Sequence, residues 1–237
     1  MTERGFSYPA SPAQLPPDPA DDAAVVDLAE RKKTGYGLAA HPAAGTDNSP
    51  VDRYYATLST ADQSRFDLAL FGPNDRKVTV KIPGRGRFRV PSEGCEAESR
   101  RRLAGDVILW ARMAYTPEAI DIQLSDRSRA APPYLAALQQ WRRCMAVSGH
   151  SYVEPEAAYR SLRDELRETG TAAFRERERA VAVADGTCAL RARLPTAALT
   201  TRRELVASLN DDVRRSLNKL AAHRAAVVAR AEEGGGQ

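Results

Sequence analysis

The sequence lacks the features that would place it across a membrane or around a metal ion. No apolar run approaches the roughly 18 residues that a membrane helix needs, which excludes an integral membrane protein. The first nine residues carry charge with no apolar stretch after it, so they are not expected to act as a signal peptide. The three histidines, His41, His150 and His223, have no second ligand at metal-binding spacing, so no metal site is predicted.

Motifs for catalysis and cofactor binding are equally scarce. Gly84 and Gly86 lack the third glycine of a dinucleotide-binding turn, and no Walker-type phosphate loop occurs. The carboxylates Glu176, Glu178 and Asp185 share one expected helix, where a solvated ladder of arginine and glutamate explains them better than a catalytic set. The sequence therefore predicts no catalytic residue and no cofactor, although an enzyme stays open because active sites need not carry motifs.

Lysine is rare, since only 5 of the 35 basic residues are lysine and the other 30 are arginine. The planar fork of arginine suits phosphate and carboxylate groups. However, the 31 acidic residues are interspersed among the basic ones, and a GC-rich genome would explain both the arginine and the abundant alanine. The net charge of +4 alone is therefore a weak argument for a nucleic-acid partner.

What the sequence does contain is a mainly helical pattern. The expected fold is mainly α, a helical bundle-like domain with one β-hairpin at about 77–90 and a Pro-rich N-terminal arm. Residues 1–50 hold 7 of the 15 prolines and should form a partly ordered arm, with a short helix over Ala23–Lys33 that Gly35 ends. Residues 51–233 should form a single domain with two degenerate repeat halves, followed by a disordered tail over 234–237.

Capping residues predict several short helices before residue 130. Asp52 and Thr60 are each expected to cap a helical stretch within 51–71. Alternating apolar and basic residues on either side of Pro83–Gly86 then predict a hairpin with one dry face, which must pack on helices because a lone hairpin is marginal in water. Further short helices are expected over Cys95–Leu103, Ile108–Ala114 and Pro117–Ser125.

Longer helices are expected in the second half of the chain. Pro132 and Pro155 should each open a helix, and Thr171 should cap another. A capping box that starts at Thr201 predicts one helix of about 30 residues, reaching Glu233. The apolar stripes of two of these helices are Tyr134, Leu138, Trp141 and Met145, and Phe174, Val181 and Cys188.

One short pattern, M-x-x-x-G-x-S-Y, occurs twice, starting at Met1 and at Met145. Cys144 precedes the second copy and Cys188 follows it, whereas only Cys95 follows the first copy. A duplicated unit with a cysteine at each end would explain this, with one cysteine absent from the chain. It suggests a Cys144–Cys188 disulfide and a single Cys95; the alternative is three buried thiols of a cytosolic protein, which the odd cysteine count favours.

Three of these elements together resemble a family of uncharacterised actinobacterial envelope proteins. They are Trp141-Arg-Arg-Cys144-Met145 with the pattern that follows it, Gly94-Cys95, and Asp185-Gly-Thr-Cys188. The resemblance implies a helical protein that is secreted or lipid-anchored and often encoded beside transporter genes. The family tends to carry a cysteine before the first Met-x-x-x-Gly, where this chain starts at the methionine. The chain is therefore expected to be extracytoplasmic if it is a trimmed mature form, and cytoplasmic otherwise.

Basic residues gather in and after the expected hairpin. They offer a candidate surface for an anionic polymer, either nucleic acid or, outside the cell, teichoic acid and lipid head groups. The alternative is that lysine and arginine only guard exposed strand edges against aggregation. The candidate anion-binding residues are Lys77, Lys81, Arg85, Arg87, Arg89, Arg100, Arg101 and Arg102.

The leading functional expectation is a non-enzymatic binding or accessory protein of the bacterial cell envelope, with a transporter component or a wall polymer as partner. A cytoplasmic nucleic-acid-binding protein that uses the basic hairpin at 76–89 is the first alternative. The second alternative is a helical oligomeric scaffold formed through the 201–233 helix.

Overall fold

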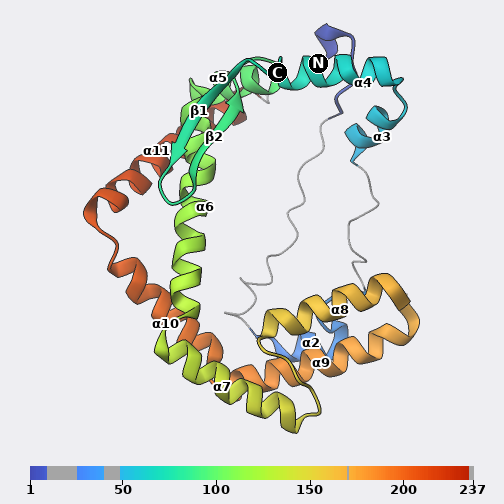
Figure 1. Cartoon of the computed structure of the whole chain (residues 1–237), viewed down its shortest axis with the longest axis vertical. Coiled ribbons are helices and arrows are strands. Elements are labelled where there is room, and N and C mark those ends of the chain that lie inside the picture. Colours follow the sequence, from blue (N-terminus) through green and yellow to red (C-terminus); the bar gives the residue numbers. More distant parts are fainter. Residues whose placement is uncertain (10–25, 40–48, 170, 235–237) are drawn as a thin grey trace. The chain divides into compact units, whose positions relative to one another are not determined.

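The computed structural model describes residues 1–9, 26–39, 49–169 and 171–234, and the chain divides into two compact units. The first unit comprises residues 1–12, 48–124 and 208–237, and the second comprises 13–47 and 125–207. The described residues form ten α-helices, one 3-10 turn and one two-stranded hairpin (Figure 1), which confirms the predicted mainly α fold with one hairpin. The assignment of 51–233 to one domain stays a prediction.

The first unit holds the hairpin and the helices around it. Its elements are the 3-10 turn η1 (Thr2–Arg4), α3 (Pro50–Ala56), α4 (Thr60–Phe71), β1 (Lys77–Ile82), β2 (Gly86–Pro91), α5 (Cys95–Ala104), α11 (Asp211–Gly234) and the start of α6 (Val107–Arg129). Serines cap the first two helices, in place of the predicted Asp52 and Thr60. The Ser49 hydroxyl accepts a hydrogen bond from the Asp52 N–H in a full capping box, and the Ser59 hydroxyl accepts one from Asp62.

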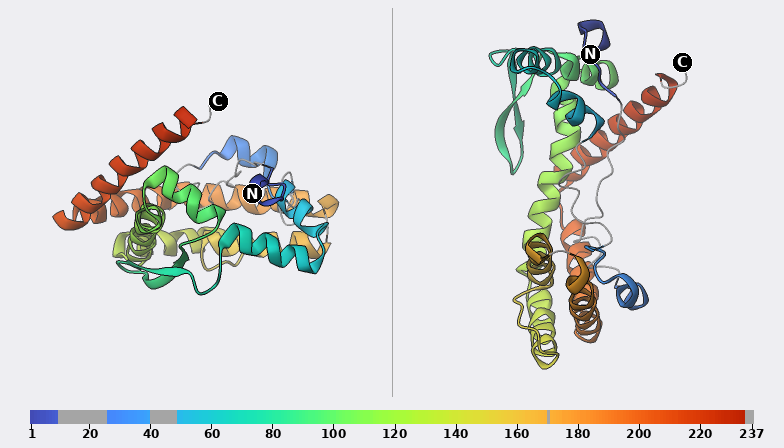
Figure 2. Two further views of the ribbon diagram at one scale, coloured as in Figure 1. Left: turned by 90° about the horizontal axis from the view of Figure 1, so that it is seen from above. Right: turned by 90° about the vertical axis from the view of Figure 1, so that its right-hand side faces the viewer.

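The two strands pair antiparallel, with Val80 opposite Phe88 and Lys81 opposite Arg87. Pro83 and Gly84 form the turn between them, and the positive φ of 79° at Gly84 suits glycine at the third turn position. Val80, Ile82 and Val90 are buried against Ala97 of α5 and against α6, beside which the hairpin lies in Figures 1 and 2. The predicted dry face and its packing on helices are thus confirmed.

Helix α6 is continuous, so the two short helices predicted over Ile108–Ala114 and Pro117–Ser125 are wrong. Pro117 lies inside the helix, where a proline normally costs about 3 kcal/mol. Ala111 and Ala119 lie on either side of it and belong to the same buried cluster as the hairpin strands. Packing against one hairpin therefore holds both halves of the helix in line, which local sequence signals do not report.

The prediction of one 30-residue helix from Thr201 to Glu233 is also wrong, because residues 208–210 are not helical and separate two helices. Helix α10 (Leu194–Ala207) ends before the break, and Thr201 is buried within it instead of capping its start. Asn210 begins α11 by accepting a hydrogen bond from the Val213 N–H through its side chain, at 2.8 Å. Leu220 and Val227 of α11 then pack against Ala104 and Met113, and Arg230 donates a hydrogen bond to the Leu103 carbonyl.

The second unit is built from helices alone among its described residues. They are α2 (Leu28–Thr34), α7 (Pro132–Val147), α8 (Pro155–Thr169), α9 (Thr171–Arg191), α10 and the end of α6. The helices predicted to open at Pro132 and Pro155 are confirmed. Both predicted stripes point inward, with Leu138, Trp141 and Met145 on α7 and Phe174, Val181 and Cys188 on α9 all buried.

The Pro-rich arm contributes two described segments, one to each unit. Residues 1–9 belong to the first unit, where Phe6 packs edge-on against Phe66 at 5.4 Å between ring centroids. Residues 26–39 contain α2, which Asp27 caps and which ends at Gly35, the end that was predicted. The helix begins at Leu28, so Val26 and Asp27, which the prediction placed inside it, precede it. Residues 23–25 of the predicted helix and residues 235–237 of the expected 234–237 tail lie outside the described residues, whereas Gly234 is the last residue of α11.

Candidate functional site

The outward side of the hairpin carries a run of basic side chains. Strand alternation and the pairing register place Lys77 and Lys81 of β1 and Arg87 and Arg89 of β2 on the face opposite the buried one. We call these four residues the basic face. Lys81 stands directly opposite Arg87, so two like charges are neighbours across the strands.

Within the described ranges, acidic side chains do not pair with the cations of the basic face. Among the described residues, none of its four cations forms an ion pair with a carboxylate. Arg89 donates only a long hydrogen bond of 3.4 Å, to the backbone carbonyl of Asp75. The face therefore presents four positive charges that no carboxylate of the described residues balances.

The other predicted anion-binding residues are engaged within the protein. Arg85, at the turn, forms a 2.5 Å ion pair with Glu118 of α6 and lies 4.8 Å from the centre of the Tyr115 ring. Along α5, Arg100 pairs with Glu96 and Arg102 with Glu98, each one helical turn earlier, while Arg101 donates to the Ser92 carbonyl. The structure thus brings the four strand residues together and gives Arg85 and Arg100–Arg102 local partners.

The predicted Cys144–Cys188 disulfide is present in the second unit. The two Cα atoms lie 5.5 Å apart, within the range that a disulfide requires, and the bond joins α7 to α9. Cys188 is fully buried in a core cluster that also contains Trp141 and Met145. Cys95 is a half-buried free thiol in the first unit.

The sequence analysis missed a buried carboxylate cluster on α9. Glu178 and Asp185 are both buried, so the interpretation of Glu178 and Asp185 as part of a solvated ladder is wrong, whereas Glu176 is exposed as expected. A signal was present in the spacing, because both residues fall on the stripe that runs from Phe174 through Val181. Carboxylates on an apolar helical stripe need partners from elsewhere in the chain.

Those partners come from residues 26–39, which we call the docked segment. Glu178 accepts hydrogen bonds from the backbone N–H groups of Leu38 and Ala39, at 2.7 and 3.2 Å. A Cβ atom at Gly35 would lie 2.8 Å from Glu178 Cγ, so the turn after α2 approaches the carboxylate more closely than a side chain would allow.

Asp185 is the centre of the second set of contacts. One carboxylate oxygen accepts from Arg31 at 2.6 Å and from the Tyr36 hydroxyl at 2.8 Å, and the other accepts from Trp141 Nε1 at 2.8 Å. Arg31 also donates to the Ala182 carbonyl and lies 5.2 Å from the centre of the Tyr36 ring. Three donors from the docked segment and α7 therefore satisfy one buried charge.

Burial raises the pKa of Tyr36 far above its ordinary value near 10, and the adjacent Asp185 carboxylate raises this pKa further. The hydroxyl therefore stays protonated and keeps donating its hydrogen bond throughout the neutral and mildly alkaline range. Gly186 allows the close approach that this geometry needs, because a Cβ there would lie 2.8 Å from Leu28 Cδ2. The carboxylate cluster is thus a fully hydrogen-bonded structural contact that holds the docked segment on α9.

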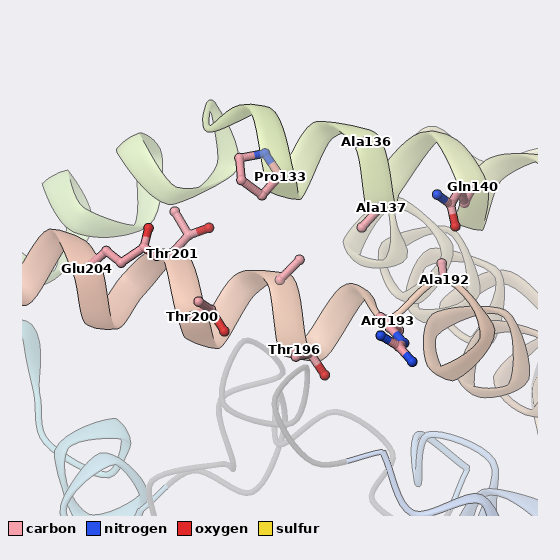
Figure 3. Close-up of a pocket in the computed structure, with 11 residues that line it drawn as sticks. Pro133, Ala136, Ala137, Gln140, Ala192, Arg193, Thr196, Thr200, Thr201 and Glu204 are labelled. Atoms are coloured by element: carbon pink, nitrogen blue, oxygen red, sulfur yellow. The ribbon is translucent and has the colours of Figure 1, made fainter.

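An open groove of about 340 Å³ lies between α7 and α10 in the second unit (Figure 3). Its lining is dominated by alanine, threonine and proline, including Pro133, Ala137 and Thr200. Arg193 and Glu204 are the charged residues of the lining, and both are exposed. The small side chains let the two helices approach closely, and this packing explains the groove. We assign no chemistry to it.

The described ranges offer neither a metal-binding cluster nor a membrane-spanning helix. No group of three or more histidine, cysteine, aspartate or glutamate side chains there is arranged to hold a metal ion. No helix in those ranges combines the length and apolar character that crossing a bilayer requires. Comparison of the chain with protein-family models, with curated proteins and with solved structures finds no match.

Proposed function

We propose that the protein is a non-enzymatic binding or accessory protein of the bacterial cell envelope, and that it binds an anionic polymer with repeated phosphodiester groups through the basic face. The observation that carries the proposal is the basic face itself, where three exposed cations and the half-buried Lys77 stand without carboxylate partners among the described residues. Such a surface attracts a polyanion, because each lysine or arginine close to an anionic surface contributes about 1 kcal/mol of binding free energy.

The arrangement of the charges favours binding over a guard against aggregation. Charged side chains, above all lysine, can guard an exposed strand edge, but that role does not require like charges to face each other across a strand pair. Here Lys81 and Arg87 stand opposite each other, and like charges in this position destabilise a hairpin. An anionic partner that bridges them turns that repulsion into a favourable contact.

The disulfide supports a location in an oxidising compartment, since such bonds persist outside the cytosol and are rare within it. It therefore favours an envelope polymer over nucleic acid as the partner of the basic face. The resemblance to actinobacterial envelope proteins agrees with this location. An association with a transporter component follows from that resemblance alone.

The test is binding of the oxidised protein to purified teichoic acid, measured by calorimetry over a range of salt concentrations. Replacing two cations of the basic face, in Lys81→Gln/Arg87→Gln, removes about 2 kcal/mol and should weaken binding roughly 30-fold at low salt. The matched control, Arg215→Gln/Lys219→Gln on α11, removes the same charge from an exposed helix of the same unit and should leave binding within about 3-fold.

Duplex DNA at equal phosphate concentration provides the competing arm. Tighter binding to DNA than to teichoic acid, with the same dependence on Lys81 and Arg87, would replace the envelope polymer by nucleic acid. Equal losses in the test and control variants would overturn the basic face as the binding site, because only net charge would then matter.

A further inference from the structure

Helices α7 and α9 of the second unit are joined by two neighbouring links. Trp141 Nε1 of α7 donates a hydrogen bond to Asp185 of α9 at 2.8 Å. One helical turn further along each helix, Cys144 of α7 is bonded to Cys188 of α9. The disulfide therefore fixes the spacing of the two helices beside the Trp141–Asp185 hydrogen bond.

The same carboxylate of Asp185 holds the docked segment. One of its oxygens accepts from Trp141, and the other accepts from Arg31 and from Tyr36. The hydrogen bond from α7 thus helps to set the direction of the carboxylate, and the carboxylate sets where the donors of the docked segment lie. A displacement of α7 from α9 would weaken both sets of contacts, because hydrogen bonds lose strength as their distance and angle change.

The docked segment also touches the core cluster that contains the disulfide. Val26, at the start of the segment, packs against the cluster to which Cys188 belongs. A Cβ atom at Gly186 would lie 3.0 Å from Val26 Cγ1, which shows how closely the segment approaches α9 there. Leu38, near the other end of the segment, packs in a separate cluster with Phe174. The segment is therefore attached at two places, one of which is beside the disulfide.

Helix α2 depends on this attachment. It has seven residues, fewer than the roughly 12 that an isolated helix needs in water. Two of its backbone hydrogen bonds, from the Arg31 N–H to Asp27 and from the Gly35 N–H to Arg31, are each 3.0 Å long. These bonds persist only while the segment is held on α9, so exchange of the Arg31 and Gly35 amide hydrogens reports docking.

We propose that the Cys144–Cys188 disulfide controls the docking of residues 26–39. The oxidised second unit holds the α2 end of the segment, and reduction releases that end because Trp141 is no longer fixed beside Asp185. The part of the chain that carries α2 is then free to leave α9. The proposal does not depend on the basic face or on its ligand.

Reduction requires a dithiol as the reductant. Cys144 is half-buried and Cys188 is fully buried, so a thiolate of the dithiol attacks Cys144 Sγ. The disulfide bond breaks, and Cys188 leaves as a thiolate that takes up a proton. The second thiol of the reductant then attacks the mixed disulfide, releases Cys144 as a thiol and leaves the reductant as a cyclic disulfide. Two electrons and two protons thereby pass from the dithiol to the two cysteines.

The experiment compares amide hydrogen exchange of the full chain by NMR, in the oxidised form and after reduction with dithiothreitol. Alkylation and intact mass identify the two forms, with one modifiable thiol before reduction and all three after it. Reduction should speed exchange at Arg31 and Gly35 about tenfold or more, as expected for the loss of a hydrogen bond to a charged group. Cys144→Ala/Cys188→Ala gives the same comparison without a reductant, so slow reduction of the buried bond does not decide the result.

Other amides separate release of the segment from general loosening of the unit. The Leu38 amide, bonded to Glu178 about 15 Å before Cys188 along α9, should change less than the two α2 amides. The amides of Leu162 and Leu166 on α8, which are buried in the cluster far from the disulfide, should stay within about threefold. The proposal fails if the α2 amides do not change, or if the α8 amides speed up by the same factor, because reduction then acts on the whole unit.

Trp141→Phe tests whether the disulfide acts through the Trp141–Asp185 hydrogen bond. Phenylalanine keeps a ring in the core but has no N–H, so the oxidised variant should already show faster exchange in α2. Reduction should then add much less than in the wild type, because both changes remove the same contact. Trp110→Phe, in the first unit, is the matched control and should leave exchange in α2 unchanged. An undiminished effect of reduction in Trp141→Phe would overturn the proposed route through Asp185.

Discussion

The two units treat charge in opposite ways. On α9 of the second unit, Glu178 and Asp185 are buried, and each accepts at least two hydrogen bonds from donors elsewhere in the chain. On the hairpin of the first unit, the basic face carries four cations, three of them exposed and two directly opposite each other. The charges on α9 hold parts of the chain together, whereas those on the hairpin face solvent.

The difference indicates which charges are structural and which are available to a ligand. A buried carboxylate with complete hydrogen bonding is costly to disturb, because any loss leaves a group without a partner in a medium of low polarity. An exposed cation beside another cation gains nothing from folding, so its removal leaves the fold intact. We therefore expect substitutions in the two regions to change stability with different magnitude and with opposite sign.

The largest effect is expected from Asp185→Asn. The amide keeps the shape of the carboxylate but cannot accept from Arg31, Tyr36 and Trp141 together, and it leaves the charge of the half-buried Arg31 uncompensated. The second unit should lose about 3–5 kcal/mol of unfolding free energy. Urea titration read by hydrogen exchange and mass spectrometry over α9 and residues 26–39 measures this loss.

Glu176→Gln is the matched control, since Glu176 lies on the same helix but is exposed. It should change the unfolding free energy by less than about 0.5 kcal/mol. If both variants lose the same amount, the carboxylate cluster does not stabilise the unit, and the contrast between the two regions is lost.

A smaller, pH-dependent effect is expected from Tyr36→Phe. Near neutral pH the variant should lose about 1–2 kcal/mol, because the hydroxyl donates to an ionised carboxylate. The folded protein keeps Tyr36 protonated since its pKa is raised, whereas the unfolded chain ionises near pH 10. The stabilisation is thus complete below about pH 10 and falls by about 1.4 kcal/mol for each further unit of pH.

The gap in stability between wild type and Tyr36→Phe should consequently close between about pH 10 and 11, as urea unfolding at each pH would show. The exposed Tyr8→Phe, in the first unit, controls for the general effect of alkali on the fold. A gap that stays constant up to pH 11 would contradict the role assigned to the Tyr36 hydroxyl.

The smallest effect, and the one of opposite sign, belongs to the basic face. Lys81→Gln/Arg87→Gln removes repulsion across the strands and should raise the stability of the first unit by about 0.2–1 kcal/mol at low salt. Added salt should shrink the gain, because screening weakens the repulsion in the wild type. Thermal unfolding followed by circular dichroism at low and high salt measures both.

Arg85→Gln supplies the contrast on the same hairpin. It breaks the ion pair with Glu118 and the contact with the Tyr115 ring, so stability should fall by about 1 kcal/mol. If Lys81→Gln/Arg87→Gln also lowers stability, the cations of the basic face are structural and the proposed binding role loses its support.

Local patterns predicted much of the fold. Strict alternation around Pro83–Gly86 indicated the hairpin, and the seven-residue spacing of Phe174, Val181 and Cys188 indicated the buried side of α9. The repeated M-x-x-x-G-x-S-Y pattern and the cysteines around it led to the prediction of the Cys144–Cys188 disulfide. In each case the chemistry that decides the structure lies within a few residues along the chain or recurs in it.

The features that the sequence missed depend on distant partners. The sequence predicts Asp185 as a surface residue, because its counter-charge, Arg31, lies more than 150 positions away along the chain. It predicts Pro117 as the start of a helix, because the packing of the hairpin on both sides of this proline is not visible locally. Glutamates one turn earlier pair with Arg100 and Arg102, contacts that the candidate anion-binding set did not take into account. Such outcomes follow from tertiary packing, which overrides local preference.

The way in which Glu178 holds the docked segment constrains how this protein can vary among its relatives. Its carboxylate binds main-chain N–H groups at Leu38 and Ala39, so it recognises the path of the backbone and not the identity of the side chains. These two buried residues can therefore be exchanged for other apolar residues of similar size, but not for proline, which has no N–H to donate. Arg31 and Tyr36 have no such freedom, since their side chains carry the donors, and a divergent relative should keep this pair together with Asp185 or lose all three.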